Sequence, residues 1–235
     1  MTLEIRADTT PTLHPGMLHH LDGYDKDTQG FVETAEMAFT AAYEGIGAVH
    51  AARKGAEQNP TLNDAARLIV VADFAENHLT KILLKIDQAT AVLKRSVASV
   101  NATLNAPIEG AATGGMTSEI RAHAKTLTRQ DRTALLANAV NARDTKTLAA
   151  LLGAPPFLSG LSDAEANLYR RQFHEAIHPD LIKRLKVMEG ALSLLYKNGG
   201  LVFHEMEKAV GAGADKVAAI RSAKAKAEKT YTFAA

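Results

Sequence analysis

The chain has 235 residues, enough for one large domain or two small ones, and its formal net charge is +1. That charge argues against a polyanion-binding surface over the whole protein, and the absence of Cys excludes a disulfide framework, a thiolate nucleophile and a Cys zinc site. Apolar residues make up 46% of the chain but aromatic residues only 5%, which favours closely packed helices over strands. We expect neither a signal peptide nor a membrane-spanning helix, because the first residues lack the apolar segment of a signal peptide and no run of about 18 apolar residues occurs.

Residues 1–30 have no helical period and combine Pro and Gly with polar residues. We expect an extended arm that becomes ordered against a neighbour, with a short strand at Thr2–Arg6. The arm contains His14, His19 and His20. A histidine cluster of this kind can bind a metal, but surface contacts are the more common use of such residues.

Two long helices are predicted next, over residues 28–56 and 61–106, with a turn at Asn59-Pro60. No Pro or Gly interrupts residues 61–106, so this helix would be roughly 67 Å long at 1.5 Å per residue. A seam this long needs other long helices, from this chain or from copies of it. The apolar residues of the seam follow a 4–3 spacing that only Ser96 interrupts: Leu68, Ala72, Ala75, Leu79, Ile82, Ile86, Ala89, Leu93 and Val100.

Shorter helices fill the second half of the sequence. Ser162 and Glu165 form a capping box for one of them. An apolar loop at 154–160 carries Phe157 and Leu158, and we expect these two residues and Leu161 to plug a core or a neighbour. The helices predicted here are 118–126, 129–142, 145–152, 162–177, 180–197 and 201–229.

The predicted fold class is all-α, as an elongated bundle of long antiparallel helices with a cluster of short helices in the middle and an extended N-terminal arm. The predicted organisation is an arm at 1–30, a long hairpin at 31–106 and a linker at 107–115. The remaining region, 116–235, would join the short-helix cluster to a C-terminal hairpin and pack as one unit with 31–106.

Residues 174–178 match H-E-x-x-H, a pattern of zinc peptidases. In that interpretation His174 and His178 bind zinc and Glu175 activates the bound water. The third ligand would be Glu189, His204, Glu205 or Glu207, of which Glu205 lies at a separation that some zinc peptidases use. However, Pro179 disfavours helical geometry at His178, so the alternative is a pair of histidines at a helix end. We expect no enzyme activity and no cofactor, with a zinc-dependent hydrolase as an alternative function.

The predicted last helix is basic, and a basic helical tail can follow phosphates. Nucleic acid is therefore an alternative partner, although no aromatic stacking residues are interleaved and a solvated charged face has the same pattern. The basic residues are Lys216, Arg221, Lys224, Lys226 and Lys229.

Residues 148–185 (LAALLGAPPFLSGLSDAEANLYRRQFHEAIHPDLIKRL) resemble helical proteins encoded in tailed phages and prophages. The polar arm, the Ala-rich helices and the modest size fit virion or assembly components of that kind. The resemblance implies a location in a virion or in the host cytoplasm, and it transfers no functional residue.

Our leading hypothesis is a non-enzymatic structural protein that forms homo-oligomers or packs against other virion proteins. An internal or ejected virion protein and a head or tail assembly factor both fit, and a cytosolic helical adaptor unrelated to phages shares the same physics. The expected interaction residues are Leu68, Leu79, Ile82, Ile86 and Leu93 in the seam and Phe157 and Leu158 in the loop.

Overall fold

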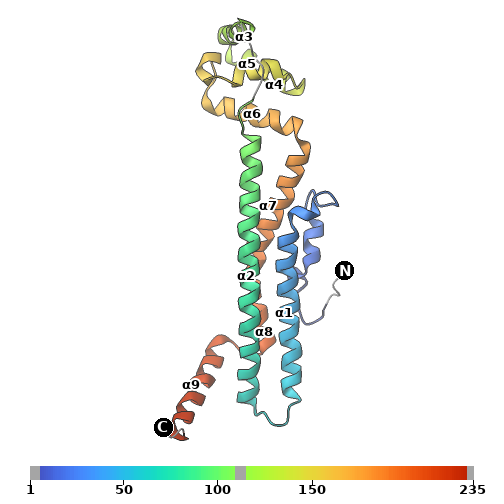
Figure 1. Cartoon of the computed structure of the whole chain (residues 1–235), viewed down its shortest axis with the longest axis vertical. Coiled ribbons are helices and arrows are strands. Elements are labelled where there is room, and N and C mark those ends of the chain that lie inside the picture. Colours follow the sequence, from blue (N-terminus) through green and yellow to red (C-terminus); the bar gives the residue numbers. More distant parts are fainter. Residues whose placement is uncertain (1–5, 109–114, 232–235) are drawn as a thin grey trace. The chain divides into compact units, whose positions relative to one another are not determined.

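The computed structural model describes residues 6–108 and 115–231, and over these residues the protein is all-α (Figure 1). The described residues form nine α-helices and four short 3₁₀ turns, without a strand. The predicted fold class is therefore confirmed. None of the helices in the described ranges has an apolar stretch sufficient to traverse a lipid bilayer.

The chain divides into two compact units. Unit 1 comprises residues 1–94 and 187–235, and unit 2 comprises residues 95–186. The division falls inside α2 (Asp64–Leu104) and inside α7 (Pro179–Gly199). The C-terminal helices thus belong with the first hairpin rather than with the short-helix cluster. Of the predicted linker, residues 109–114 lie outside the described residues.

In unit 1, α1 (Glu33–Glu57) and α2 form the predicted hairpin. Asn63 caps the start of α2, since its Oδ1 accepts a hydrogen bond from Ala66 N at 2.9 Å. At Gly45 of α1, a Cβ would lie 2.9 Å from Ile82 Cδ1, so the side chain of Ile82 on α2 packs against this glycine. The apolar residues at 3–4 spacing along α1 and its N-cap are all buried: Val32, Ala35, Phe39, Ala42, Ile46 and Val49.

The seam of α2 is largely covered by the chain itself. Ala72, Ala75, Ile82, Ala89 and Leu93 are buried, and the four remaining apolar positions are half-buried: Leu68, Leu79, Ile86 and Val100. Two predicted interaction residues, Ile82 and Leu93, are therefore core residues and are not available to a partner. The prediction missed this because the pattern of a seam is the same whether the covering helices come from the same chain or from another.

The N-terminal segment is not an extended arm. Leu13 and Leu18 are each only 1% exposed, and Thr12 O accepts a hydrogen bond from Asn198 Nδ2 of α7 at 3.0 Å. Its buried leucines follow no helical period, so the sequence pattern did not reveal them. Of the strand predicted at Thr2–Arg6, all but Arg6 lies outside the described residues. The segment forms three 3₁₀ turns, of which η1 and η2 pack most closely on α1: η1 (Pro11–Leu13), η2 (Pro15–His20) and η3 (Gln29–Phe31).

The predicted last helix is two helices, α8 (Leu201–Val210) and α9 (Ala214–Tyr231). They are separated at Gly211, which has φ +84° and whose N–H donates to Glu207 O at 2.9 Å. A glycine in the left-handed conformation commonly ends a helix, which explains the break after Val210. The first of the two helices, α8, packs against α1.

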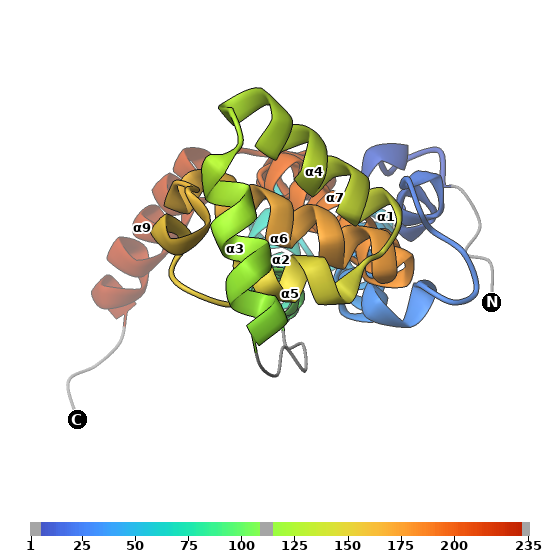
Figure 2. The same cartoon turned by 90° about the horizontal axis from the view of Figure 1, so that it is seen from above.

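Unit 2 is built from short helices that cross one another in several directions (Figure 2). The side chains of Thr128, Asp144 and Ser162 accept the backbone N–H groups that cap α4, α5 and α6, as expected for N-cap residues. The unit has its own core, which includes Leu136, Leu148 and Phe173. Besides the end of α2 and the start of α7, its elements are α3 (Gly115–Thr126), α4 (Arg129–Asn141), α5 (Thr145–Leu152), η4 (Pro156–Ser159) and α6 (Asp163–Ile177).

Candidate interaction surfaces

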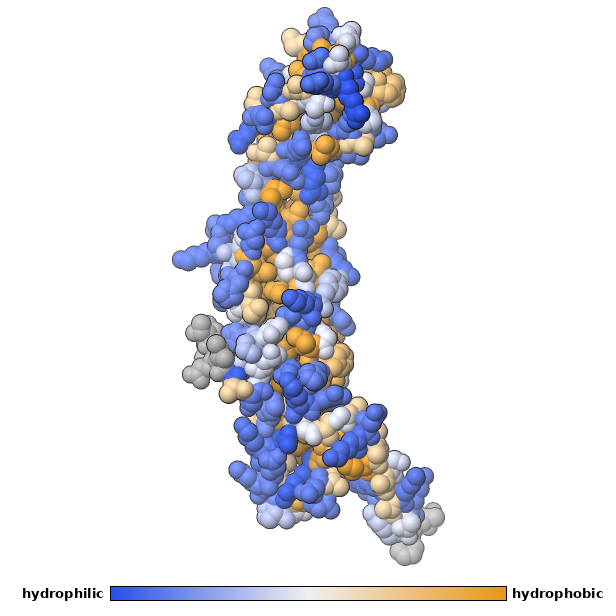
Figure 3. Space-filling model, turned by 180° about the vertical axis from the view of Figure 1, so that it is seen from behind, coloured by the Kyte–Doolittle hydropathy of each residue, from blue (hydrophilic) through white to orange (hydrophobic). Residues whose placement is uncertain are grey.

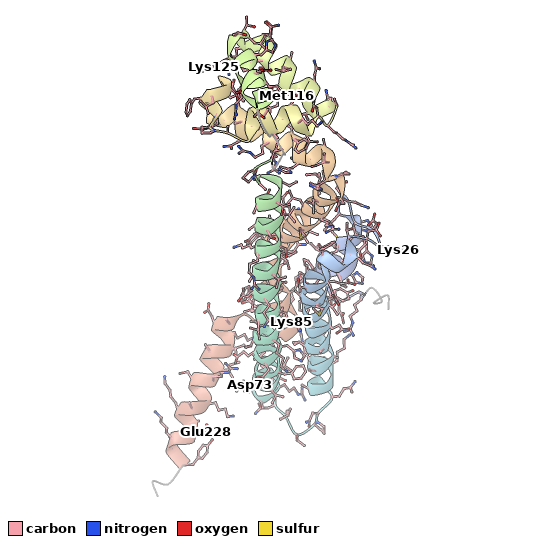
Figure 4. The ribbon with its side chains drawn as sticks, turned by 45° about the horizontal axis from the view of Figure 1, so that its top comes forward. Lys26, Asp73, Lys85, Met116, Lys125 and Glu228 are labelled. Atoms are coloured by element: carbon pink, nitrogen blue, oxygen red, sulfur yellow. The ribbon has the colours of Figure 1, made fainter. Side chains whose placement is uncertain are left out.

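Two large apolar side chains stand exposed on η4 in unit 2. Phe157 is 66% and Leu158 39% exposed, although the next residue, Ser159, is fully buried. We call Phe157 and Leu158 the knob. Met116, labelled in Figure 4, is also exposed and lies on α3, the helix that packs against η4. The predicted plugging of the chain's own core is confirmed for Leu161, which is buried in the core of unit 2. It is wrong for the knob, whose contact with a neighbour stays a prediction.

Hydrogen bonds hold the turn that presents the knob. Ser159 Oγ donates to Leu151 O at 2.9 Å inside the unit. Gly160 closes the turn with φ +72°, a conformation that costs glycine little, and its N–H donates to Phe157 O at 3.2 Å. The shape of the turn is therefore fixed without burial of the knob.

Arg132 on α4 joins this turn to the end of α3. Its Nε and Nη2 donate to Ala124 O and Leu127 O, each at 2.9 Å, and its Nη1 donates to Gly160 O. Carbonyls at a helix C-terminus lack partners within the helix and form the negative end of its dipole. The guanidinium of Arg132 donates hydrogen bonds to such carbonyls and places a positive charge next to the dipole. Sequence reasoning missed this residue, because one arginine among several carries no spacing signal.

Unit 1 contains an apolar groove of about 390 Å³ between α2, α8 and α9. We call it the groove. Figure 3 shows apolar side chains gathered where α9 leaves the rest of unit 1. Its charged lining residues are Glu76, Glu207 and Arg221. Phe203 lines the groove and is 50% exposed. The main apolar lining residues are Ala72, Leu79, Phe203, Met206, Val210 and Val217.

Arg221 fastens α9 to α2. Its Nη1 lies 2.6 Å from Glu76 Oε1 and its Nη2 lies 2.5 Å from Asp73 Oδ1. The hydrogen bond to Glu76, followed by that to Asp73, raises the pKa of Arg221 above its ordinary value. Figure 4 shows Asp73 on α2 and Glu228 near the far end of α9. Because Val217 is the buried residue of α9, the helix is attached mainly through its first half.

The five basic residues predicted to contact nucleic acid all lie on α9. Arg221 is bound to the two α2 carboxylates described above, and Lys224 Nζ lies 3.8 Å from Glu228 Oε1. Lys216, Lys226 and Lys229 are exposed. Two of the five charges are thus compensated within unit 1.

The H-E-x-x-H residues lie where α6 ends. His178 is the C-cap of α6, as Pro179 led us to expect, and its ring stacks on that of His174 with centroids 6.1 Å apart. His174 is 8% exposed, its Nε2 donates to Ala106 O at 2.9 Å, and its Nδ1 is buried. Glu175 Oε1 accepts a hydrogen bond from Arg171 Nε at 2.8 Å. Neither ring nitrogen of His174 is open to a metal ion.

The remaining candidate ligands do not join this pair. Glu205 belongs to unit 1, where it is buried and lies 2.7 Å from Lys208 Nζ. In the N-terminal segment, His14 Nδ1 accepts from Gly16 N at 3.0 Å, and the His19 ring contacts Tyr24. Over residues 6–108 and 115–231, no three His, Asp or Glu side chains lie close enough together to hold a metal ion.

Comparisons of the chain with protein-family models, with curated proteins and with solved structures find no match.

Proposed function

We propose that the protein is a non-enzymatic structural protein that self-associates or packs into a larger particle. The observation that carries the proposal is the knob, in which Phe157 and Leu158 project into solvent from a turn fixed by Ser159 and Gly160. Exposed apolar side chains on a rigid support are typical of surfaces that bind another protein, because contact removes them from water.

The assembly that we favour is a phage-type virion, with the protein as an internal or ejected component or as a head or tail assembly factor. Support comes from the resemblance of residues 148–185, which contain the knob, to helical proteins of tailed phages. The all-α, Cys-free architecture is consistent with that setting.

The test is the solution mass of the full-length protein, measured by light scattering over a range of concentrations. We expect masses above the 25.1 kDa of one chain, and we expect the double variant Phe157→Ser/Leu158→Ser to lose them. Leu168→Ser is the matched control, because Leu168 is an exposed leucine on α6 outside η4. Circular dichroism checks that all variants remain folded.

Two results would overturn the proposal. One is a wild-type protein that stays at 25.1 kDa at every concentration. The other is a double variant that associates as strongly as the wild type while the protein remains folded.

A further inference from the structure

The knob and the groove are apolar surfaces of opposite shape on the same chain. The knob consists of two side chains that project from unit 2, and the groove is an open hollow in unit 1 that leaves Phe203 half exposed. Each leaves apolar area in water, and contact between the two would remove area from both at once.

The charges of the two units are also opposite. Unit 2 contains 12 Lys and Arg against 8 Asp and Glu, for a net charge of +4, whereas unit 1 contains 15 against 18, for a net charge of −3. Without α9, which has 5 basic and 2 acidic residues, unit 1 has a net charge of −6. Unlike units of two molecules therefore attract, and like units repel.

The local charges have the same signs. On the groove side, Glu76, Glu207 and Arg221 line the groove. Arg221 pairs with Glu76 and with Asp73 beside it, so these three carboxylates outnumber the one guanidinium. On the knob side, α3 packs against η4 and carries Arg121 and Lys125, the second of which is labelled in Figure 4, against one acidic residue, Glu119. A copy that brings its knob to the groove brings a helix with an excess of basic residues toward a surface with an excess of acidic residues.

We propose that the groove of unit 1 receives the knob of a second copy of this chain, so that copies join head to tail. The proposal rests on the proposed function, because it names the partner and the surfaces through which self-association occurs. Contact of one knob with another is disfavoured, since it would bring together two units with a charge of +4 each.

A head-to-tail contact has a consequence for the size of the assembly. Knob and groove are different surfaces, so a pair of copies joined by one contact still presents one unused knob and one unused groove. Such an interface closes into a ring or continues as a filament, whereas a contact between identical surfaces stops at a dimer. The mass should therefore rise with concentration beyond that of two chains.

The test uses two full-length variants, each lacking one surface. Phe157→Ser/Leu158→Ser removes the knob and keeps the groove, and Phe203→Glu places a carboxylate in the groove and keeps the knob. Phe203 is half exposed, so the substitution leaves the core intact. Leu201→Glu is the control, since it adds the same charge to α8 at a residue that does not line the groove.

We expect each of these two variants alone to remain at 25.1 kDa and their equimolar mixture to form a complex of twice that mass and no larger. One intact knob and one intact groove allow a single contact in the mixture. The Leu201→Glu control should assemble like the wild type.

The outcomes separate the two proposals. If Phe203→Glu assembles like the wild type, or if the mixture remains monomeric while the wild type assembles, the groove is not the site and only this inference fails. If the wild type itself stays monomeric at every concentration, the proposed function fails as well.

Discussion

Replacing Arg132 by Met removes three hydrogen bonds to backbone carbonyls in a single change. Hydrogen bonds from charged groups contribute about 1.5–3 kcal/mol each in mutational series, and their effects overlap at one side chain. We expect the free energy of unfolding to fall by about 2–4 kcal/mol, measured by urea denaturation. Lys125→Met on α3 is the control, with an expected change within about 0.5 kcal/mol.

The Arg132→Lys variant tests the geometry of this contact. An ammonium group keeps the charge but lacks the planar fork that reaches three carbonyls, so an intermediate loss of stability is expected. Equal stability of the Met variant and the Lys125→Met control would contradict the role assigned to Arg132.

Gly45 and Gly55 lie on the same helix, α1, but we expect their replacement by Ala to change the stability of the protein in opposite directions. At Gly45 a Cβ would lie 2.9 Å from Cδ1 of the buried Ile82, so we expect a destabilisation of about 1 kcal/mol or more from overpacking. At Gly55 nothing lies within 4 Å, and the higher helix propensity of Ala should stabilise by up to about 1 kcal/mol. The melting temperatures of both variants test this expectation. A higher melting temperature of Gly45→Ala would contradict the packing of Ile82 against Gly45.

Glu165 links the capping box to acid stability. Hydrogen bonds from Ser162 N and Oγ, followed by the contact with Arg129, lower the pKa of Glu165 from 4.5 to about 2. A lowered pKa means that the ionised group stabilises the folded state above pH 4.5, and that this stabilisation is lost as the pH falls toward 2. Glu165→Gln should therefore flatten the dependence of the melting temperature on pH in that range.

The same substitution at Glu119, which lies on α3 outside the capping box, is the control. It should leave the slope of the acid limb unchanged. If Glu165→Gln and Glu119→Gln have the same slope as the wild type, the capping box does not hold the ionised carboxylate as described.

At the scale of the elements, we expect that the contact of α9 with the rest of unit 1 depends on the side chain of Arg221. Exposed ion pairs contribute little to global stability, so Arg221→Ala should leave the melting temperature almost unchanged. It should, however, increase amide hydrogen exchange over Ala214–Tyr231, because Arg221 connects α9 to Glu76 and Asp73. Lys224→Ala is the control, since Lys224 pairs with Glu228 within α9 itself. Unchanged exchange in Arg221→Ala would show that Val217 alone holds the helix.

The limits of the helices were predictable where period and caps agree. Ser162 and Glu165 placed the start of α6, and Pro179 placed its end at Ile177. The prediction failed at Gly211, because a glycine inside a periodic pattern is compatible with both a continuous helix and a left-handed break. It failed again at Leu13 and Leu18, which are buried without any period.

At the scale of the whole molecule, the opposite charges of the two units predict that assembly depends on salt. Raising the ionic strength from about 0.1 M to about 1 M shortens the Debye length from about 10 Å to about 3 Å. We therefore expect the mass at a fixed concentration to fall, measured by light scattering. A mass that stays constant or rises would indicate an association driven by apolar contact alone.

Of the two candidate surfaces, the sequence predicted the knob but not the groove. The knob was visible because Phe157 and Leu158 stand together in one loop. The groove was not, because its walls come from three helices and it exists only once Phe203 is left outside the core. The sequence did not reveal the division into two units either, because both cores are built from the same few types of apolar residue.

The position of the unit boundary inside α2 and α7 affects how the chain can be dissected. Lys94 and Arg95 at one crossing, and Lys186 and Val187 at the other, are all helical. Cutting at either point would strand backbone N–H and C=O groups in mid-helix. A protease that requires an extended substrate finds no loop at these crossings, although three of the four residues have side chains that trypsin recognises. A fragment that contains only unit 2 would thus begin and end in the middle of a helix. To keep these helices whole, the fragment would have to extend to natural helix caps such as Asn63.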